Sequence, residues 1–157
     1  MLRWLWLSLA VIVLDQVAKQ LVESSFLLYE SKEIMSLFNL KLVYNEGAAF
    51  SFLSDQSGWQ RWFLSGVAGV VTGVMVFWLR GLKQQERVIA FALALIIGGA
   101  VGNLIDRIVY GHVIDFLDFH YGQHHWPAFN LADSAISLGV ALMLYEMLFA
   151  GGDKQER

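Results

Sequence analysis

Two aspartates, Asp115 and Asp133, have the residue type and placement that acid–base hydrolysis needs. They lie in the stretch 98–134, which begins within one apolar segment, ends at the start of another, and contains four aspartates and all four histidines. Ionisable groups are costly beside hydrocarbon, so a cluster between two apolar segments is a functional-site hypothesis by default. Two carboxyls that share a site do not both ionise easily, so one keeps a proton while the other takes a proton from water. Such a pair can hydrolyse a peptide bond without a covalent intermediate.

One loop joins the two apolar segments, so both carboxyls are expected near the same membrane face. Asn130 is a candidate N-cap of the fourth segment, which would place Asp133 near the positive end of a helix dipole. We therefore expect Asp133 to be the more acidic partner and Asp115 to hold the proton. The alternative makes Asp133 only a first-turn capping acid and Asp115 a solvated loop residue. Asp118 is a competing acid, because the local pattern alone does not separate it from Asp115.

Further polar residues follow helical spacing on two apolar segments. Asn103 and Arg107 share one face of the third segment, and that face leads to Asp115. Arg107 is therefore placed to hold a carboxylate or a substrate carbonyl by charge-assisted hydrogen bonds. Asp15 and Lys19 are spaced i, i+4 on the first segment. For them we favour the interpretation of a self-neutralising pair that lets polar groups enter the membrane.

Other catalytic chemistries have weaker support. The chain has no cysteine, which excludes a disulfide framework, a thiol nucleophile and a cysteine-based metal site. The histidines do not form an H-E-x-x-H pattern, and no serine lies in a G-x-S-x-G elbow, so we expect no metal. A metal peptidase and a Ser–Lys peptidase that uses Lys19 are kept as less favoured alternatives. The net charge of -3 without a basic run gives no sign of a nucleic-acid partner.

The elements that must position these residues are membrane spans. Of the 157 residues, 57% are hydrophobic and 16% are charged, whereas about a quarter of a soluble domain is charged. Four segments are long and apolar enough to cross a bilayer, namely 4–22, 62–79, 88–110 and 131–149. The first would form a helix of roughly 28 Å, close to the hydrocarbon thickness of about 30 Å. No small-residue cleavage site follows it, so we interpret it as a retained span.

Basic residues set the expected orientation. They lie at the N-terminus, in the link 80–87 and in the C-terminal tail, and the positive-inside rule places such segments in the cytoplasm. Both termini are then cytoplasmic, and the segments 23–58 and 111–130 lie outside.

The outer segments carry a strand pattern. Residues 36–44 alternate between apolar and polar types, which predicts a strand. A lone strand is unstable, so we expect a small outer β region over about 26–44, with 26–29 or part of 112–119 as its partner. The apolar segment 45–53 is predicted to lie as a short helix in the membrane surface. Without a repeat or a linker, residues 1–157 are expected to form one domain.

Four motifs resemble, in order and spacing, those of the lipoprotein signal peptidase (signal peptidase II) family. They are Asn45-Glu-Gly-Ala-Ala-Phe, Gly102-Asn103-Leu-Ile-Asp106-Arg107, Val113-Ile-Asp115-Phe116 and Phe129-Asn130-Leu-Ala-Asp133. Asp15 and Lys19 on the first span also match. The resemblance implies four transmembrane helices, a small outer β-cradle and a short interfacial helix.

The resemblance also implies an activity. The family are aspartyl endopeptidases of the bacterial inner membrane, and they cleave prolipoproteins before a cysteine that carries diacylglycerol. Their catalytic pair falls on Asp115 and Asp133. Their supporting residues fall on Asp15, Lys19, Asn45, Asn103, Arg107 and Asn130. No metal or organic cofactor is implied, the cyclic peptide globomycin is expected to inhibit, and we expect a monomer surrounded by membrane lipid.

Two other classes of function remain open at this point. A small proton- or ion-coupled transporter would use the intramembrane polar residues as an ion path, but no inverted repeat is visible between the halves. A non-catalytic scaffold would use them only to hold helices together. We further expect the segment 45–53 to act as a lid or lipid-side clamp, in which Phe50 and Phe52 contact the substrate.

Overall fold

The computed structural model of the chain describes residues 1–47 and 58–150, and it confirms a mainly helical architecture. Its long helices are α1 (Leu5–Ser25), α2 (Trp59–Gly81), α3 (Arg87–Val109) and α4 (Leu131–Tyr145). A short 3-10 helix, Leu2–Trp4, precedes α1, and a π-helical turn, Glu146–Ala150, continues α4. Four helical segments in the described ranges are long and apolar enough to cross a membrane. They coincide with the four predicted spans.

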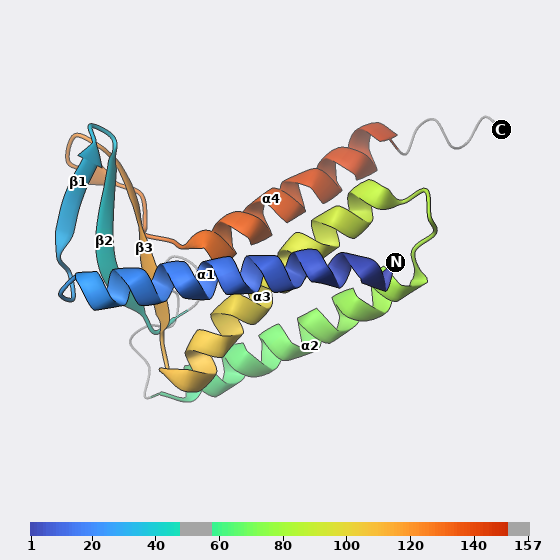
Figure 1. The fold of residues 1–157 in the computed structure, drawn as a ribbon, viewed down its shortest axis with the longest axis horizontal. Helices are drawn as coiled ribbons and strands as arrows, with labels where there is room; N and C mark the ends of the chain where they lie inside the picture. Colours follow the sequence, from blue (N-terminus) through green and yellow to red (C-terminus); the bar gives the residue numbers. More distant parts are fainter. Residues whose placement is uncertain (48–57, 151–157) are drawn as a thin grey trace.

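Helix α3 is the central element of the bundle, because it packs against each of the other three helices (Figure 1). Small residues permit this close packing. A Cβ built on Gly98 would lie 2.8 Å from Val11 Cβ of α1, and one on Gly99 would collide with the Ala132 carbonyl oxygen of α4. On α2, by contrast, a Cβ on Gly73 would meet nothing within 4 Å among the described residues. The glycines therefore permit close helix packing on α3, whereas Gly73 on α2 has no such part among the described residues.

Replacing Gly99 by alanine is expected to lower the unfolding free energy by about 1–3 kcal/mol, because the new methyl group would collide with backbone rather than with a movable side chain. Thermal unfolding in detergent measures the change. Gly73→Ala is the matched control, and it should be neutral or slightly stabilising, since alanine has the higher helix propensity. Equal unfolding temperatures for the two variants would contradict this account of the α3–α4 contact.

The sheet lies at one end of the bundle, and the N-terminus lies at the other (Figure 1). It has the order β1-β2-β3-β4, in which β1 is Ser31–Met35, β2 is Phe38–Asn45, β3 is Val113–Tyr121 and β4 is His124–His125. All neighbouring strands are antiparallel. A buried cluster of Val22, Leu42, Ile114 and Phe116 joins the end of α1 to the sheet. The strand predicted at 36–44 and its pairing with 112–119 are thus confirmed.

Residues 26–29, the alternative partner for that strand, form no strand of their own, but the Tyr29 N–H does donate to the Leu42 carbonyl of β2 at 2.8 Å. Two other hydrogen bonds close a turn here: the Leu27 N–H donates to Glu30 Oε2 and the Glu30 N–H to the Leu27 carbonyl. Tyr29 has a left-handed backbone, with a φ of 67°. The outer strand therefore begins later, at Ser31. Most of the predicted interfacial helix 45–53, including Phe50 and Phe52, lies outside the described residues.

Candidate active site

Asp133 is positioned by the start of α4. Asn130 is the N-cap: its side chain accepts a hydrogen bond from the Asp133 N–H at 2.9 Å, and Asp133 Oδ2 accepts one from the Asn130 N–H at 3.3 Å. This reciprocal capping box satisfies two amide groups that a helix start otherwise leaves unpaired. The predicted N-cap is confirmed, and it fixes the backbone that carries Asp133.

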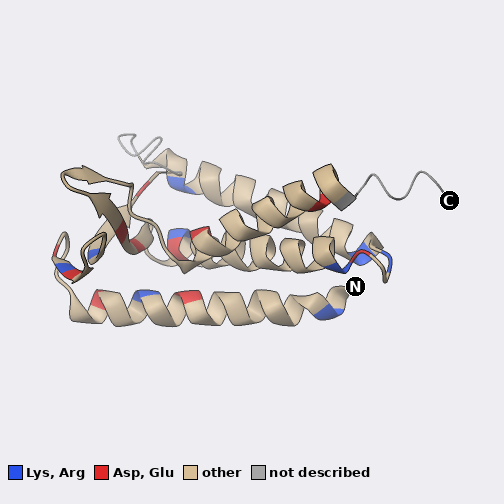
Figure 2. Ribbon diagram, turned by 90° about the horizontal axis from the view of Figure 1, so that it is seen from above, with Lys and Arg blue, Asp and Glu red and all other residues tan. Residues whose placement is uncertain are grey.

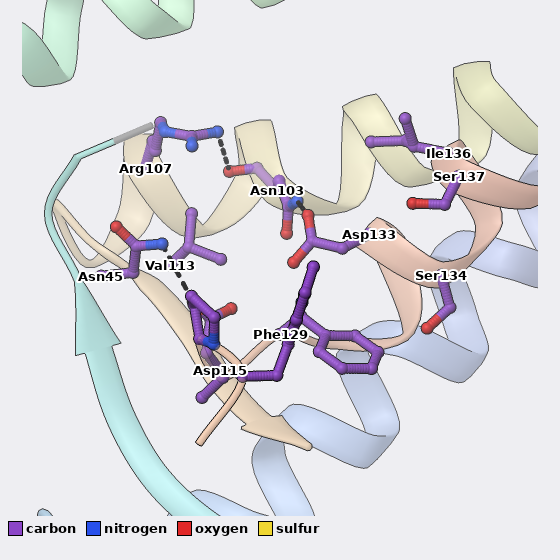
Figure 3. Close-up of a pocket in the computed structure, with 13 residues that line it drawn as sticks. Asn45, Asn103, Arg107, Val113, Asp115, Phe129, Asp133, Ser134, Ile136 and Ser137 are labelled. Atoms are coloured by element: carbon purple, nitrogen blue, oxygen red, sulfur yellow. Dashed lines mark hydrogen bonds between the residues drawn. The ribbon is translucent and has the colours of Figure 1, made fainter. Parts of the chain in front are cut away.

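Asp115 is positioned by strand β3, where it pairs with Val43 of β2. Its side chain and that of Asp133 line one cavity of about 520 Å³. Figure 3 shows Asp115 entering this cavity from the strand and Asp133 from the helix. Asn45, Asn103, Arg107, Val113, Trp126, Pro127, Ala128, Phe129, Ser134, Ile136 and Ser137 complete the lining. The two carboxyls therefore share a site, as predicted from the topology of the spans.

Three asparagine amides hold the two carboxyl groups. Asp115 Oδ2 accepts a hydrogen bond from Asn45 Nδ2 at 3.0 Å, and its Oδ1 accepts one from Asn130 Nδ2 at 2.7 Å. Asp133 Oδ1 accepts one from Asn103 Nδ2 at 2.7 Å. Asn130 thus binds Asp115 with its amide nitrogen and the Asp133 backbone with its amide oxygen. The Asn45–Asp115 and Asn103–Asp133 bonds are drawn in Figure 3.

The Asp115 carboxyl is a weaker acid than an ordinary aspartate side chain. Burial, and after it the nearby Asp133 carboxylate, raise its pKa to about 7 against the opposing hydrogen bonds from Asn45 and Asn130. Both main causes disfavour the charged form of the group. Asp115 therefore keeps a proton up to near-neutral pH, as a general acid must.

A buried charge cluster lies behind the asparagines. Lys19 Nζ lies 2.7 Å from Asp15 Oδ2, 2.7 Å from Asp106 Oδ2 and 2.8 Å from Asn103 Oδ1. Asp15 Oδ1 in turn accepts a hydrogen bond from the Ala132 N–H in the first turn of α4, at 2.9 Å. The ion pair predicted within α1 is present, but it is not self-contained: through Asn103 and Ala132 it reaches the two elements that hold Asp133.

Asp106 is a member of this cluster that the sequence placed in a motif but that we did not predict as a site residue. It is fully buried, and its Oδ1 accepts a hydrogen bond from Gln16 Nε2 at 2.7 Å. Its Oδ2 accepts one from the Ile114 N–H at 3.2 Å, directly before Asp115. Its spacing of three residues from Asn103 was the available signal.

Arg107 lines the cavity as predicted, but its hydrogen bonds differ from the expected ones. Its terminal nitrogens donate to the backbone carbonyls of Asn103, at 3.5 Å, and of Gly47, at 3.3 Å. Its Nε is buried without a hydrogen-bond partner among residues 1–47 and 58–150. The side chain is therefore held by backbone rather than by a carboxylate.

The structure separates Asp118 from Asp115. Asp118 is buried, and its carboxylate lies 2.9 Å from His125 Nδ1 and accepts a hydrogen bond from Asn39 Nδ2 at 3.1 Å. It does not line the cavity. Three residues apart on a strand, the two aspartates project to opposite faces. The four histidines likewise stay outside the cavity lining.

Four helices of spanning length indicate a multi-pass membrane protein, and its cavity beside the small sheet holds a pair of carboxyl groups. The family model for signal peptidase (SPase) II matches residues 7–149. The chain belongs to this family, and it is therefore a peptidase.

Relatives and solved structures agree with this assignment. The lipoprotein signal peptidase of Cupriavidus taiwanensis is 53% identical over 94% of this chain and 83% of its own length. That of Azoarcus sp. is 54% identical over 99% of this chain and 88% of its own length. A bacterial membrane enzyme solved by the in meso method at 2.3 Å resolution superposes with a TM-score of 0.88 at 29% identity, covering 99% of this chain and 93% of the other. None of these similarities supports the transporter interpretation.

Proposed function

We propose that this chain removes signal peptides from prolipoproteins by aspartic peptidase chemistry, cleaving before a cysteine that carries diacylglycerol. The observation that carries this proposal is the shared cavity of Asp115 and Asp133. Membership of the signal peptidase II family and the names of the relatives support the substrate class.

The proposed reaction uses the two carboxyls in opposite protonation states. The Asp133 carboxylate takes a proton from a water molecule, whose oxygen attacks the carbonyl carbon of the scissile bond. The Asp115 carboxyl gives its proton to the carbonyl oxygen. The tetrahedral intermediate then collapses and the C–N bond breaks. The leaving amine takes up the proton that Asp133 had accepted, and a hydroxyl of the intermediate returns a proton to the Asp115 carboxylate, which restores both groups. The raised pKa of Asp115, to about 7, supports its role as the acid.

The supporting residues have separate parts in this proposal. Asn45, Asn103 and Asn130 hold the carboxyl oxygens, and Arg107 donates to a substrate carbonyl from the cavity wall. Asp15 and Lys19 act without lining the cavity. Asp15 fixes the first turn of α4 through the Ala132 N–H, and Lys19 fixes the Asn103 amide. No metal or cofactor enters the reaction. Globomycin is expected to bind in the same cavity.

The proposed site faces the outside of the bacterial inner membrane. Basic residues gather at the N-terminus and over the link between α2 and α3, at the end of the bundle opposite the sheet (Figure 2). The positive-inside rule assigns that end, with both termini, to the cytoplasm. A signal peptide is itself an apolar helix and the modified cysteine is anchored in lipid. A site at the outer interface can therefore meet the scissile bond without drawing the substrate out of the membrane.

A cleavage assay tests the proposal. The purified protein in detergent is mixed with a precursor lipoprotein, with and without diacylglycerol on its cysteine, and a gel shift reports release of the signal peptide. We expect cleavage of the lipidated precursor alone. Cleavage of both forms would contradict the lipid requirement, and cleavage of neither by a folded preparation would overturn the proposed function.

The pH dependence of this reaction follows from Asp115. Because the pKa of that carboxyl is raised to about 7, the acid form is lost as the pH rises through neutrality, and kcat/KM should fall there. The apparent pKa of this fall in kcat/KM belongs to the coupled Asp115–Asp133 pair rather than to one residue. Asn45→Ala removes a hydrogen bond that favours the charged form of Asp115, so the fall in kcat/KM should move to higher pH. A kcat/KM that stays constant or rises through neutral pH would contradict the assignment.

A further inference from the structure

The cavity has a second wall that the proposed chemistry does not use. The consecutive residues Trp126, Pro127, Ala128 and Phe129, here called the 126–129 wall, line the same cavity as Asp115. Three of the four are large and apolar or conformationally stiff, and none can exchange a proton. A peptide whose scissile bond reaches the carboxyl pair must place neighbouring atoms within this cavity. The 126–129 wall is therefore suited to recognise substrate side chains.

Both ends of the 126–129 wall are attached to strand β3. The Trp126 N–H donates to the Phe119 carbonyl at 2.8 Å, and Phe129 exchanges two backbone hydrogen bonds with Leu117, at 2.8 and 3.1 Å. The rings of Phe119 and Phe129 are stacked, with centroids 5.9 Å apart. Since β3 also carries Asp115, one strand sets both the reacting group and the wall.

The residue before the wall has a side-chain anchor. His125 Nδ1 lies 2.9 and 3.0 Å from the two oxygens of Asp118, and Asn39 Nδ2 donates to the same carboxylate. A carboxylate can only accept, so the Nδ1 atom carries the proton in this contact. Asp118 is 3% exposed, whereas the His125 side chain is 48% exposed. The Asp118 carboxylate is thus buried in the sheet, and the half-exposed His125 ring contacts it from the surface.

The Asp118–His125 contact lies where the backbone pairing between β3 and β4 is short. Strand β4 has two residues, and it pairs with β3 only through His120↔His125 and Tyr121↔His124 in the described structure. So short a hairpin is marginal by itself. The stacking of His120 on His125, with centroids 5.1 Å apart, adds to the contact with Asp118. The position of the Trp126 end of the wall therefore depends on these side chains outside the cavity as well as on the backbone bond to Phe119.

We propose that Asp118 and His125 are positioning residues that hold the 126–129 wall in place, and that this wall selects the substrate side chains beside the scissile bond. The proposal rests on the proposed peptidase function. It assigns Asp118, the acid that does not reach the cavity, a part in substrate binding rather than in proton transfer.

The first test compares variants of His125 in the cleavage assay with the lipidated precursor. His125→Ala should raise KM by about three- to tenfold, as expected for loss of a partly exposed hydrogen bond to a charged group, while kcat changes by less than about twofold. His125→Asn keeps a donor near the Nδ1 position and should recover most of the wild-type KM. His124→Ala, the exposed neighbour, is the matched control and should behave as wild type. His125→Gln, with its amide displaced from that position, should resemble His125→Ala, and it replaces that variant if the latter fails to fold.

The second test measures selectivity. The wild type is given two precursors that differ only in the size of one side chain beside the scissile bond, and the ratio of their kcat/KM values is measured. His125→Ala and Asp118→Ala should each bring this ratio closer to one. The two substitutions remove the same contact, so the double variant should differ little from either single one. An unchanged KM and preference, or a loss confined to kcat, would overturn this inference while leaving the peptidase function intact. Failure of the wild type to cleave would overturn both.

Discussion

Asp115→Asn and Asp133→Asn are each expected to reduce kcat for the lipidated precursor by about 10³-fold, within the range that a positioned general acid or base contributes. Asparagine matches the shape of the carboxyl and keeps its hydrogen bonds to neighbouring amides in part, but it cannot exchange a proton. Because the two groups act on the same proton transfers, the double variant should lose little more than either single variant. The cleavage assay under substrate saturation measures these rates.

The same experiment decides between catalysis and capping for Asp133. An asparagine at this position still offers an oxygen to the Asn130 N–H, so the capping box and the unfolding temperature should be retained. If Asp133 were only a capping acid, Asp133→Asn would leave kcat unchanged. Glu33→Gln, an exposed acid on β1, removes the same formal charge outside the site and serves as the control. Retention of kcat by either aspartate variant would remove that residue from the mechanism.

Elements with a strong local pattern could be predicted from the sequence. The spans follow from runs of apolar residues, and the strand at 36–44 follows from its alternation. The common location of Asp115 and Asp133 needed only the topology, because one outer loop joins the segments that carry them. Asn130 as the N-cap followed from residue type and position.

Relations set by distant contacts could not be predicted in the same way. Lys19 contacts Asn103 across 84 residues of sequence, and Asn39 contacts Asp118 across 79. The choice between Asp115 and Asp118 depends on which face of β3 lies over the cavity, and that is fixed by the register with β2. Within the 126–129 wall only Phe129 belongs to a motif, and the attachment of the wall to β3 is what brings it to the site.

The largest effect on stability is expected at Lys19. Its side chain is fully buried, and its Nζ lies 2.7 Å from both Asp15 and Asp106. Lys19→Met keeps most of the volume and removes the only cation in the described residues that forms an ion pair with these two carboxylates. Breaking a buried ion pair from one side costs about 3–5 kcal/mol, because the remaining charge is left uncompensated. Unfolding in detergent should show this loss, whereas Lys32→Met, an exposed lysine on β1, should leave stability unchanged.

A compensated variant separates the two roles of the cluster. Replacing Lys19 by methionine together with Asp15→Asn and Asp106→Asn removes the buried charges as a set, so much of the lost stability should return. Turnover should not return, because Asn103 still lacks the Lys19 contact that holds the amide bound to Asp133. Recovery of both properties would show that the cluster only neutralises itself, as its spacing on α1 first suggested. Recovery of stability alone would show that the buried charges orient the Asn103 amide, and through it the carboxylate that activates water.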